Sequence, residues 1–392
     1  MIKIKTLKEL DVRGKKVLLR CDFNVPIDSN GDIQDDFRIR QTLPTIKYLV
    51  EKKAKIILMS HLGKPEGKRI ESLSLAPIRK KLADYLGTPV ALAKDCIGKE
   101  AEKSVKKLKE GDIVLLENLR FHSGEEANDP KFVKELAKLG DVYVNDAFSA
   151  CHRKHASIFG LAQVLPSAAG LLLEKEVKIL SRVLENPWRP FCAVIGGAKI
   201  STKIKVIKQF LEKADNVLIG GKIAEPILIV KKMCIGRPWP EEEVAREIEN
   251  LDLTSTRLHL PIDAAISPDP SGKIYIRQAA PGKTRKDELL LDIGDETIGF
   301  FSQIIKDAKM ILWAGPMGYF ENPAFEKGTR EVAQAIVRNI NAYKIVGGGD
   351  TLFAVSKFGL ADKFDHVSTG GGAMLIFLGG EALPGLQVLE KK

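Results

Sequence analysis

The stretch Tyr343–Gly372, YKIVGGGDTLFAVSKFGLADKFDHVSTGGG, decides the fold class of this chain. Twice within it, a short β-branched run is followed by a turn with three glycines and then by a helical pattern. The first triplet is Gly347–Gly349 and the second is Gly370–Gly372. Strand, glycine turn and helix in repeated order predict a parallel β-sheet with helices packed against it.

The two glycine turns also suggest what the chain binds. Glycine permits positive φ and leaves backbone N–H groups uncovered, so a glycine turn at a helix N-terminus suits phosphate oxygens. Asp350 follows the first turn directly and would repel a bare anion. A carboxylate fits there if Mg²⁺ accompanies the phosphates, because oxygen ligands suit that ion. The alternative is that both are simply tight strand-to-helix turns.

Apolar runs alternate with helical patterns along the whole chain, which predicts an α/β fold with parallel sheets flanked by helices. The predicted strands are 16–20, 55–59, 113–116, 142–144, 191–195, 216–219, 310–313, 343–346 and a short one near Val367. Clear helical patterns cover 75–86, 132–139, 203–213 and 329–339. The Pro-, Ser- and Asp-rich segment 252–286 predicts irregular or antiparallel structure.

A length of 392 residues favours two domains rather than one core. The segment Leu171–Leu184 has helical apolar spacing and lies between Pro166 and Pro187, so we expect one long connecting helix there. The predicted divisions are an N-terminal domain 1–170, an interdomain helix 171–186, a C-terminal domain 187–378 and a tail 379–392 that returns to the first domain.

Composition restricts the class of protein. No apolar run approaches the ~18–20 residues of a membrane span. The N-terminal residues lack the apolar core of a secretory signal, so we expect a cytoplasmic protein. The five cysteines are widely spaced without a C-x-x-C pair, which argues against a disulfide or zinc framework.

The net charge of +10 raises the alternative of a nucleic-acid-binding protein. Residues 1–170 hold 31 Lys and Arg against 23 Asp and Glu, a net charge of +8, whereas the rest of the chain has +2. No dense basic run or basic stripe with interleaved aromatic residues occurs. A small anionic substrate therefore explains the basic first half better than a nucleic acid does.

Polar and charged side chains, and glycine turns, follow the predicted strands in both halves. In the first half these are Asp22 and Asn24, the run His61-Leu62-Gly63-Lys64, Arg120, and Asn145-Asp146. In the second half they are Gly196-Gly197-Ala198-Lys199, Gly220-Gly221, Gly315-Pro316 and the two glycine triplets. Open parallel sheets bind ligands at the carboxyl ends of their strands, so each half should carry one binding face.

The first face is rich in Arg, His and Asn. Period-2 alternation places Asp22 and Asn24 on one side of the chain, where they could hold a substrate hydroxyl; a plain strand-end turn is the alternative. Arg120 and Arg153 offer bidentate donors for a carboxylate or phosphate. The pair His152 and His155 lacks a third ligand nearby in sequence, which disfavours a metal site.

The second face is rich in Gly, Lys and Asp. Lys199 and Lys203 lie four positions apart at a predicted helix start, where both could reach one bound anion. Neither a Walker A loop nor a G-x-G-x-x-G dinucleotide fingerprint is present. The two faces together predict an anionic small molecule on one side and a nucleotide on the other.

Nine motifs in order resemble those of the phosphoglycerate kinase family over essentially the whole chain. They are 21–26 (CDFNVP), 43–46 (LPTI), 60–63 (SHLG), 117–121 (ENLRF), 144–148 (VNDAF), 196–199 (GGAK), Trp313 with 315–318 (GPMG), 347–350 (GGGD) and 368–372 (STGGG). The resemblance implies two Rossmann-like lobes joined by a hinge helix, with Mg²⁺-dependent phosphoryl transfer between ATP or ADP and 3-phosphoglycerate.

The resemblance also assigns residues to roles. The 3-phosphoglycerate site would comprise Asp22, Asn24, Arg38, His61, Leu62, Gly63, Lys64, Arg120 and Arg153. The nucleotide site would comprise Gly197, Ala198, Lys199, Lys203, Gly220, Gly221, Glu321, Gly348, Gly349, Asp350 and Thr351, with Asp350 as the ligand of Mg²⁺. Arg38, Lys199, Gly371 and Gly372 would act in catalysis. The acceptor carboxylate is already deprotonated at neutral pH, so no general base is required.

Four places depart from the family pattern. At the first two places, Lys64 replaces Arg and Thr202 replaces Asp. At the third, Lys222 replaces a glycine and Glu225-Pro226 replaces a Phe-Thr pair, and at the fourth Ala314 replaces Asn. Lysine at position 64 keeps the charge but not the bidentate geometry. We expect the last two departures to lie around the base and ribose, so that base preference is altered while transfer chemistry is kept.

The interpretation is therefore a monomeric, cytoplasmic phosphoglycerate kinase acting on small molecules, without nucleic-acid or membrane partners. Three alternatives remain. A non-catalytic relative would bind ligands without turnover, although it would not need all of Arg38, Lys199, Lys203 and Asp350. A basic nucleic-acid-binding protein would bind DNA or RNA in a salt-dependent way, and a Rossmann dehydrogenase would need the missing fingerprint.

Overall fold

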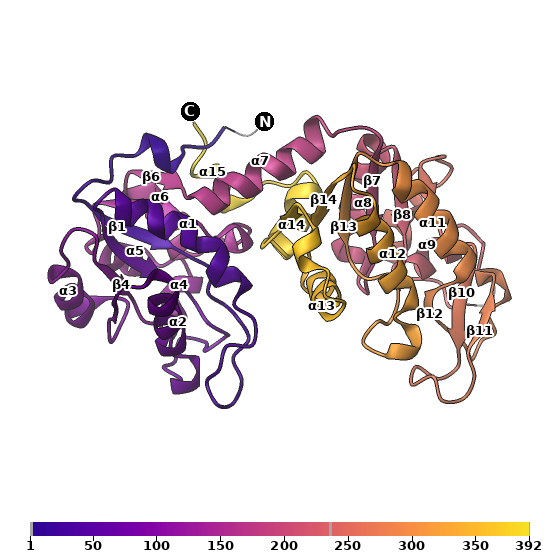
Figure 1. The fold of residues 1–392 in the computed structure, drawn as a ribbon, viewed down its shortest axis with the longest axis horizontal. Coiled ribbons are helices and arrows are strands. Elements are labelled where there is room, and N and C mark those ends of the chain that lie inside the picture. The colour runs from indigo at the N-terminus through magenta and orange to yellow at the C-terminus, as the bar shows by residue number, and fades with distance from the viewer. Residues whose placement is uncertain (1–2, 235–236, 392) are drawn as a thin grey trace. The chain divides into compact units, whose positions relative to one another are not determined.

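A computed structural model describes residues 3–234 and 237–391. The first two residues of the predicted domain 1–170 and the last residue of the tail 379–392 therefore lie outside the described residues. The chain forms two compact units: Met1–Ser181 with Ala382–Lys392, and Arg182–Glu381. Figure 1 shows the first unit in indigo to magenta with its C-terminal segment in yellow, and the second unit in magenta to yellow.

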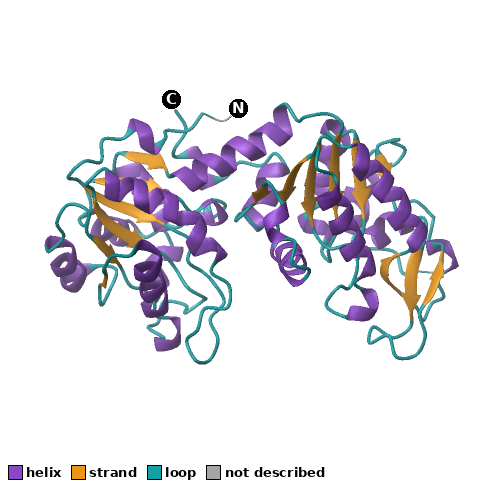
Figure 2. Cartoon of the chain, in the orientation of Figure 1, coloured by secondary structure: helices purple, strands orange, loops and turns teal. Residues whose placement is uncertain are grey.

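The first unit is built on a six-stranded parallel sheet of order β3-β4-β2-β1-β5-β6. Its strands are β1 Lys16–Arg20, β2 Lys55–Met59, β3 Val90–Leu92, β4 Ile113–Leu115, β5 Val142–Asn145 and β6 Ser167–Ala169. Its helices are α1 Phe37–Glu51, α2 Ala76–Leu86, α3 Gly98–Lys106, α4 Ser123–Glu126, α5 Pro130–Ala137, α6 Leu161–Val164 and α15 Pro384–Gln387. Helices and strands of both units are distinguished by colour in Figure 2.

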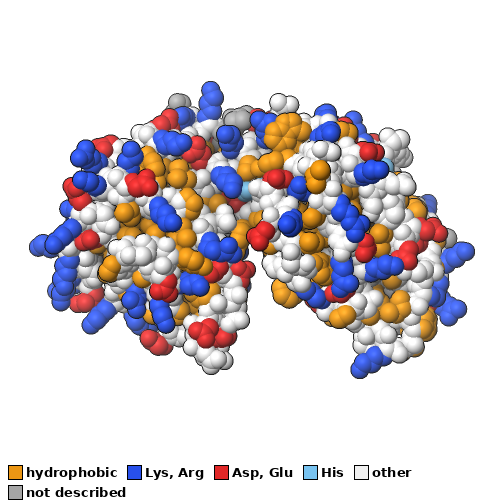
Figure 3. Space-filling model, viewed as in Figure 1, with side chains coloured by type: hydrophobic (Ala, Val, Ile, Leu, Met, Phe, Trp, Pro, Cys, Tyr) orange, Lys and Arg blue, Asp and Glu red, His pale blue; other side chains and the backbone are white. Residues whose placement is uncertain are grey.

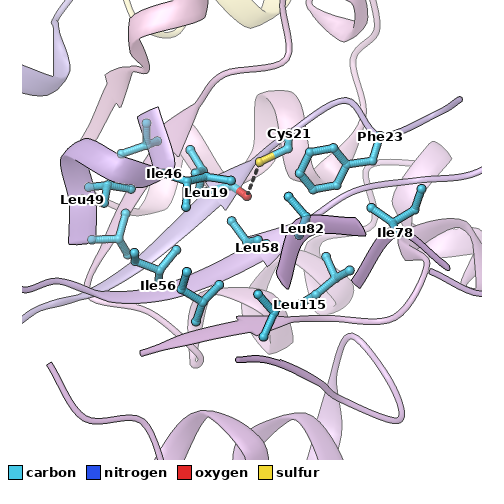
Figure 4. Packing of buried hydrophobic residues seen from close by; sticks show 14 of the residues in the cluster. Leu19, Cys21, Phe23, Ile46, Leu49, Ile56, Leu58, Ile78, Leu82 and Leu115 are labelled. Atoms are coloured by element: carbon cyan, nitrogen blue, oxygen red, sulfur yellow. Dashed lines mark hydrogen bonds between the residues drawn. The ribbon is translucent and has the colours of Figure 1, made fainter. Parts of the chain in front are cut away.

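Both faces of this sheet are buried, as expected for parallel strands between two helix layers. On one face, Leu19 and Leu58 pack with Ile46 of α1 and Leu82 of α2 (Figure 4). The neighbouring strand positions point to the opposite face and pack against α3 and α5. Arg20, the last residue of β1, lies two positions after Leu18 and therefore on the same face, toward α5. It is 1% exposed.

The second unit repeats the plan with a parallel sheet of order β15-β14-β13-β7-β8-β9. Its strands are β7 Phe191–Ile195, β8 Asn216–Ile219, β9 Leu258–His259, β13 Met310–Ala314, β14 Tyr343–Val346 and β15 His366–Val367. Its helices are α8 Ile204–Lys213, α9 Ala224–Val230, α10 Glu242–Glu249, α11 Asp295–Asp307, α12 Lys327–Arg338, α13 Gly349–Lys357 and α14 Gly372–Leu378. A separate antiparallel sheet joins β11 Arg277–Ala279, β10 Ala264–Ser267 and β12 Leu289–Ile293.

Helix α7, Leu171–Glu185, runs across the boundary between the two units. Its N-terminus is fastened to the first unit because Asp146 Oδ1 accepts hydrogen bonds from the N–H groups of Leu172 and Leu173, at 2.9 and 3.2 Å. The end of the chain also belongs to the first unit: Lys5 N donates to Leu389 O at 2.9 Å, and Lys391 N donates to Lys3 O at 2.8 Å.

The predicted α/β fold with parallel sheets is confirmed, and all nine predicted strands are present. Both glycine triplets open helices, α13 and α14. The antiparallel strands of segment 252–286 are confirmed as well. Three short strands of two or three residues, β3, β6 and β9, carried too little apolar pattern to be predicted.

Within the described residues, no helix combines the length and the apolar character that crossing a bilayer requires. On the face drawn in Figure 3, basic side chains are interspersed with acidic ones over both units rather than gathered into one stripe.

Candidate active site

The first set of candidate residues lies where β1 ends and α1 begins. Arg38, in the first turn of α1, donates to Asp22 Oδ2 at 2.8 Å and to Asn24 O at 3.1 Å. Asn24 Oδ1 accepts from Gly63 N at 2.9 Å. Burial alone would raise the pKa of Asp22, but the charge of Arg38 and the hydrogen bond from Ser149 lower it overall. Asp22 is therefore a carboxylate that holds the guanidinium in place.

His61 follows β2 and is held by a buried arginine. Arg20 Nη2 lies 3.0 Å from His61 Nδ1, and Arg20 Nη1 contacts Cys21 O. Arginine can only donate, so His61 Nδ1 accepts and the proton of the neutral ring sits on Nε2. Burial and the adjacent charge of Arg20 lower the pKa of His61 well below its ordinary value. His61 is thus fixed as a neutral ring whose Nε2–H is the donor.

Arg20 is itself part of a buried network that continues to Glu125. Its Nε donates to Ser157 Oγ at 2.8 Å, and Ser157 donates from Oγ and N to the two Glu125 oxygens at 2.6 and 2.9 Å. Burial raises the pKa of Glu125, although Arg20 and Ser157 oppose that effect. The network joins three segments far apart in sequence and fixes the side chain that orients His61.

Further cations surround this cluster. Arg120 Nη1 donates to Gly63 O at 2.7 Å, and its Nε pairs with Glu126 at 3.1 Å. Arg153 is half-buried, and its Nε donates to His152 Nε2 at 3.2 Å. Burial, with Arg120 and Arg153 nearby, lowers the pKa of His155 to about 3. A histidine kept neutral in this way marks a region of positive potential suited to an anion.

The remaining predicted residues of this unit have different environments. Leu62 is buried and Gly63 has a φ of +63°, where an added Cβ would lie 2.8 Å from Leu73. Lys64 is exposed. Residues His61–Lys64 therefore form a turn whose backbone is shaped by Asn24 and Arg120, with one flexible cation at its rim.

In the second unit, a cavity of about 260 Å³ lies between the carboxyl ends of the strands and the two glycine turns. Its lining residues are Ala198, Lys199, Thr202, Lys203, Ala314, Gly315, Gly347, Gly348, Gly349, Asp350, Thr351, Gly371, Gly372 and Leu375. We call it the glycine cavity. It joins the two turns that the sequence singled out, together with both lysines and Asp350, in one site suited to phosphate groups.

The two lysines of the glycine cavity differ in freedom. Lys203 is 8% exposed, and its Nζ contacts the carbonyl oxygens of Gly196 and Ala314, the latter at 3.3 Å. Burial lowers the pKa of Lys203 to about 8. A 3₁₀ turn, Ile200–Thr202, separates Lys199 from α8, which begins at Ile204, one residue after the predicted start at Lys203. Lys203 thus fixes the loop, whereas Lys199 is available to a ligand.

The glycines of the second unit differ in backbone conformation and in the space around them. Gly348 and Gly371 have positive φ values, +100° and +49°, and each precedes the first residue of its helix. Gly349 and Gly372 have no atom within 4 Å of an added Cβ, so their backbone faces open space. By contrast, a Cβ on Gly197 or Gly221 would collide with Lys203 or with Gly197 N, both at 2.6 Å.

A second cavity of about 280 Å³ adjoins the glycine cavity, and the two share Ala198 and Asp350. Its lining residues are Ala198, Lys222, Glu225, Pro270, Leu289, Leu290, Leu291, Pro316, Gly318, Tyr319, Glu321 and Asp350. We call it the leucine cavity. Apolar walls beside a polar, glycine-lined site suit the base and ribose of a nucleotide.

Most predicted residues meet in these two sets. Gly197, Gly220 and Gly221 instead pack against the Gly315–Met317 loop behind the cavities. Of the departures, Lys222 and Glu225 line the leucine cavity, whereas Thr202 and Ala314 line the glycine cavity. Ala314 ends β13 beside Lys203, whose Nζ contacts its carbonyl oxygen.

Asp350 fits the predicted role of Mg²⁺ ligand. Its exposed carboxylate lines both cavities and lies within the electrostatic range of Lys203. The hydroxyl of the neighbouring Thr351 accepts from Gly315 N at 2.7 Å and so holds the turn. One carboxylate beside a phosphate site matches the way Mg²⁺ is usually bound, with phosphate and water oxygens completing its shell.

Sequence reasoning missed Arg20, Ser157 and Glu125. A signal existed for Arg20, because an arginine in a strand that is buried on both faces must be paired. Nothing in the local sequence connects it with Ser157, which lies 137 positions away.

Comparison with known proteins agrees with this geometry. The sequence model of the family "Phosphoglycerate kinase" matches residues 7–381. The chain belongs to the phosphoglycerate kinase family. It is 50% identical to a phosphoglycerate kinase of Dictyoglomus turgidum over 98% of both chains, and 44% identical to one of Pelotomaculum thermopropionicum over 99% of both.

Solved structures of the family share the fold. The phosphoglycerate kinase of Coxiella burnetii is 38% identical, with a TM-score of 0.85 and 98% coverage of both chains. That of Pyrococcus horikoshii OT3 is 34% identical, with a TM-score of 0.84 and the same coverage.

Proposed function

We propose that this protein is a phosphoglycerate kinase, which transfers the phosphoryl group between a nucleoside triphosphate and the carboxylate of 3-phosphoglycerate. In the direction of glycolysis, 1,3-bisphosphoglycerate and ADP give 3-phosphoglycerate and ATP. Family membership supports the activity. The observation that supports the mechanism is that one unit has a cationic cluster around Arg38 and His61 and the other has the glycine cavity.

The cationic cluster would bind 3-phosphoglycerate. Asp22 and Asn24 O hold Arg38, while the contact of Arg20 with His61 Nδ1 leaves Nε2–H as the donor of the ring. Arg120 and Arg153 add positive charge for the phosphate and carboxylate groups of the substrate. An attacking carboxylate oxygen needs no general base at neutral pH, so this cluster only binds and orients.

The glycine cavity would bind the phosphate chain of the nucleotide. Lys199 and the backbone of Gly371 and Gly372 are available to the transferred phosphoryl group, and Asp350 would hold Mg²⁺. When bound, Mg²⁺ neutralises phosphate charge and so favours transfer. The carboxylate oxygen forms a bond to the γ-phosphorus as the bond between that phosphorus and the β,γ-bridging oxygen breaks.

Transfer of this kind depends mainly on positioning and on stabilisation of charge. Arg38 and Lys199 lie in different units, so we propose that a movement about α7 brings them to one phosphoryl group and excludes water. We further propose that the enzyme acts as a monomer in the cytoplasm on small molecules alone.

A coupled assay of ADP formation from ATP and 3-phosphoglycerate tests the function. Turnover by the full chain that requires both Mg²⁺ and 3-phosphoglycerate is expected. Binding of both ligands without turnover would instead favour a non-catalytic relative. Retention on DNA or RNA at physiological salt would favour a nucleic-acid-binding protein.

A further inference from the structure

Three side chains of types that bind metal ions lie together in the first unit, outside the residues of the two candidate sites. Asp95 and Cys96 are in the loop between β3 and α3, and His122 directly follows the 3₁₀ turn Leu119–Phe121 after β4. Strands β3 and β4 are parallel neighbours, so their carboxyl ends bring the two loops together. One oxygen, one sulfur and one ring nitrogen of these side chains all lie within 4.8 Å of one another.

The distances within this cluster are close to those of a metal site. His122 Nε2 lies 2.7 Å from Asp95 Oδ1, which also accepts from Cys96 N at 2.6 Å. In a tetrahedral zinc site with bonds of about 2.0–2.3 Å, the ligand atoms are about 3.3–3.8 Å apart. The Asp95 and His122 side chains would separate by roughly 1 Å or less to reach that spacing, which their partial exposure allows.

The cluster is buried on one side and open on the other. Cys96 is fully buried, whereas the side chains of Asp95 and His122 are 41% and 31% exposed. The sulfur is therefore the inner ligand, and the other two leave a path from solvent. Three protein ligands with a fourth position open to water is a common arrangement around Zn²⁺.

The charges around the thiol favour a cation. Burial, followed by the negative charges of Asp95 and Glu125, raises the pKa of the Cys96 thiol well above its ordinary value. A bound cation would offset the repulsion between these carboxylates and a thiolate. When the metal binds, the thiol proton passes to solvent, and the neutral His122 ring carries its proton on Nδ1.

The kinds of ligand atom distinguish between metal ions. Mg²⁺ and Ca²⁺ prefer a shell of oxygen ligands, and this cluster has one carboxylate. One thiolate, one imidazole and one carboxylate suit a borderline-soft ion such as Zn²⁺. The wide spacing of the cysteines argues only against a framework made of cysteines, whereas here the fold assembles a mixed set from two loops.

We propose that Asp95, Cys96 and His122 form a Zn²⁺ site in which water takes the fourth position. The site is separate from the Mg²⁺ position at Asp350 and does not depend on the proposed function. Strand β3 has only three residues and lies at the edge of its sheet. Bound Zn²⁺ would link the loop after this strand to the segment after β4, and so would stabilise the first unit.

Titration of the metal-free full chain with Zn²⁺ tests the proposal. A chromophoric chelator sets the free Zn²⁺ concentration, and excess Mg²⁺ keeps the ion from Asp350. One equivalent of Zn²⁺ per chain should bind, and the melting temperature should rise with Zn²⁺. Co²⁺ in place of Zn²⁺ should give the visible bands of a four-coordinate ion and a thiolate-to-metal charge-transfer band. Absence of binding, or a Co²⁺ complex without the thiolate band, overturns the proposal.

Two conservative variants test the ligands. Cys96→Ser keeps the size of the side chain but removes the sulfur, and His122→Gln keeps a donor for Asp95 but removes the ring nitrogen. Each should weaken Zn²⁺ binding by more than about tenfold, because even the loss of an outer partner of a metal ligand has that effect. Without Zn²⁺, the His122→Gln chain should melt like the unmodified chain, and it should gain no stability from the ion. Unchanged Zn²⁺ affinity in His122→Gln would mean that the cluster is only a hydrogen-bonded pair.

The control is His152→Ala, which removes one of the other two closely spaced histidines, His152 and His155. Its Zn²⁺ affinity should equal that of the unmodified chain. Loss of binding in His152→Ala, with binding kept in Cys96→Ser and His122→Gln, would place the ion at that pair and overturn the proposal.

Discussion

The two candidate binding sites of this molecule differ in the groups that form them. In the first unit, long side chains are already paired with one another: Arg38 with Asp22, Arg20 with His61 and Ser157. In the second unit, the glycine cavity is formed mainly by backbone, and Lys199 and Asp350 line it. Side chains that are already paired are pre-oriented for a small, rigid anion. Backbone without side chains can instead approach a flexible phosphate chain closely.

The difference predicts which substitutions damage catalysis and which damage folding. Substitutions among paired side chains leave partners buried and unsatisfied, so they should affect stability as well as binding. Substitutions at open glycines should affect ligands while the fold survives. The predictions below test this contrast.

The largest effect is expected at Arg38. Arg38→Ala removes the cation of the first unit that we propose acts on the transferred group, and kcat should fall by about 10²–10³-fold. Arg38→Lys keeps the charge but loses the fork that contacts Asp22 and Asn24 O, so it should recover only part of the loss. Steady-state kinetics in the coupled assay measure both.

The control for this prediction is Arg40→Ala. Arg40 lies two positions away and pairs with Asp36 on an exposed surface, so kcat should stay within a factor of two or so of the unmodified enzyme. An Arg38→Ala enzyme with ordinary kcat would show that the first unit contributes binding alone.

Next is the buried network behind His61. Arg20→Met removes the cation that acts most strongly on the fully buried Glu125, and the free energy of unfolding should fall by about 3–5 kcal/mol. The double variant Arg20→Met/Glu125→Gln should lose less than the sum of the single variants, because both residues belong to one network. Denaturant unfolding measures these differences.

Exposed Arg13 provides the comparison, since Arg13→Met should change stability by no more than about 0.5 kcal/mol. Additive losses in the double variant would contradict a coupled network and leave Arg20 as an independent contact.

This network also shows where sequence reasoning ends. Strand positions, the glycine turns and the residues at strand ends follow from local pattern, so the fold class and most of both candidate sets could be predicted. The pairing of Arg20 with Ser157 depends on how β1 and the segment after β5 pack, which no local spacing encodes. The assignment of Ala314 to one cavity and of Lys222 and Glu225 to the other depends in the same way on how neighbouring loops pack.

A smaller effect is expected at the second glycine turn. Gly371 has positive φ, so Gly371→Ala should destabilise the second unit by about 1–2 kcal/mol. Gly372 has ordinary φ and free space around an added Cβ, so Gly372→Ala should melt like the unmodified protein. Its methyl group would nevertheless cover backbone offered to the phosphoryl group, and kcat should fall.

Comparing the two variants separates strain from ligand contact. Thermal melts should rank Gly371→Ala below Gly372→Ala, while both lose kcat. Full activity in Gly372→Ala would show that this backbone does not contact the transferred group.

The smallest expected effect concerns His61, whose ring should not titrate near neutral pH in the folded protein. Burial and Arg20 lower the pKa of His61 well below that of the unfolded chain, which is about 6.5. Below pH 6.5 the unfolded state therefore binds a proton that the folded state does not, so His61 makes stability fall as pH falls from about 6.5 towards its folded pKa. In the folded protein, the NMR signal of the His61 ring should stay constant between about pH 6 and 8, whereas in urea it should titrate near 6.5. Arg20→Met should raise the folded pKa only in part, because burial remains the larger cause. A folded-state midpoint near 6.5 would mean that Arg20 does not hold the ring neutral, and the paired character of the first unit would lose its clearest example.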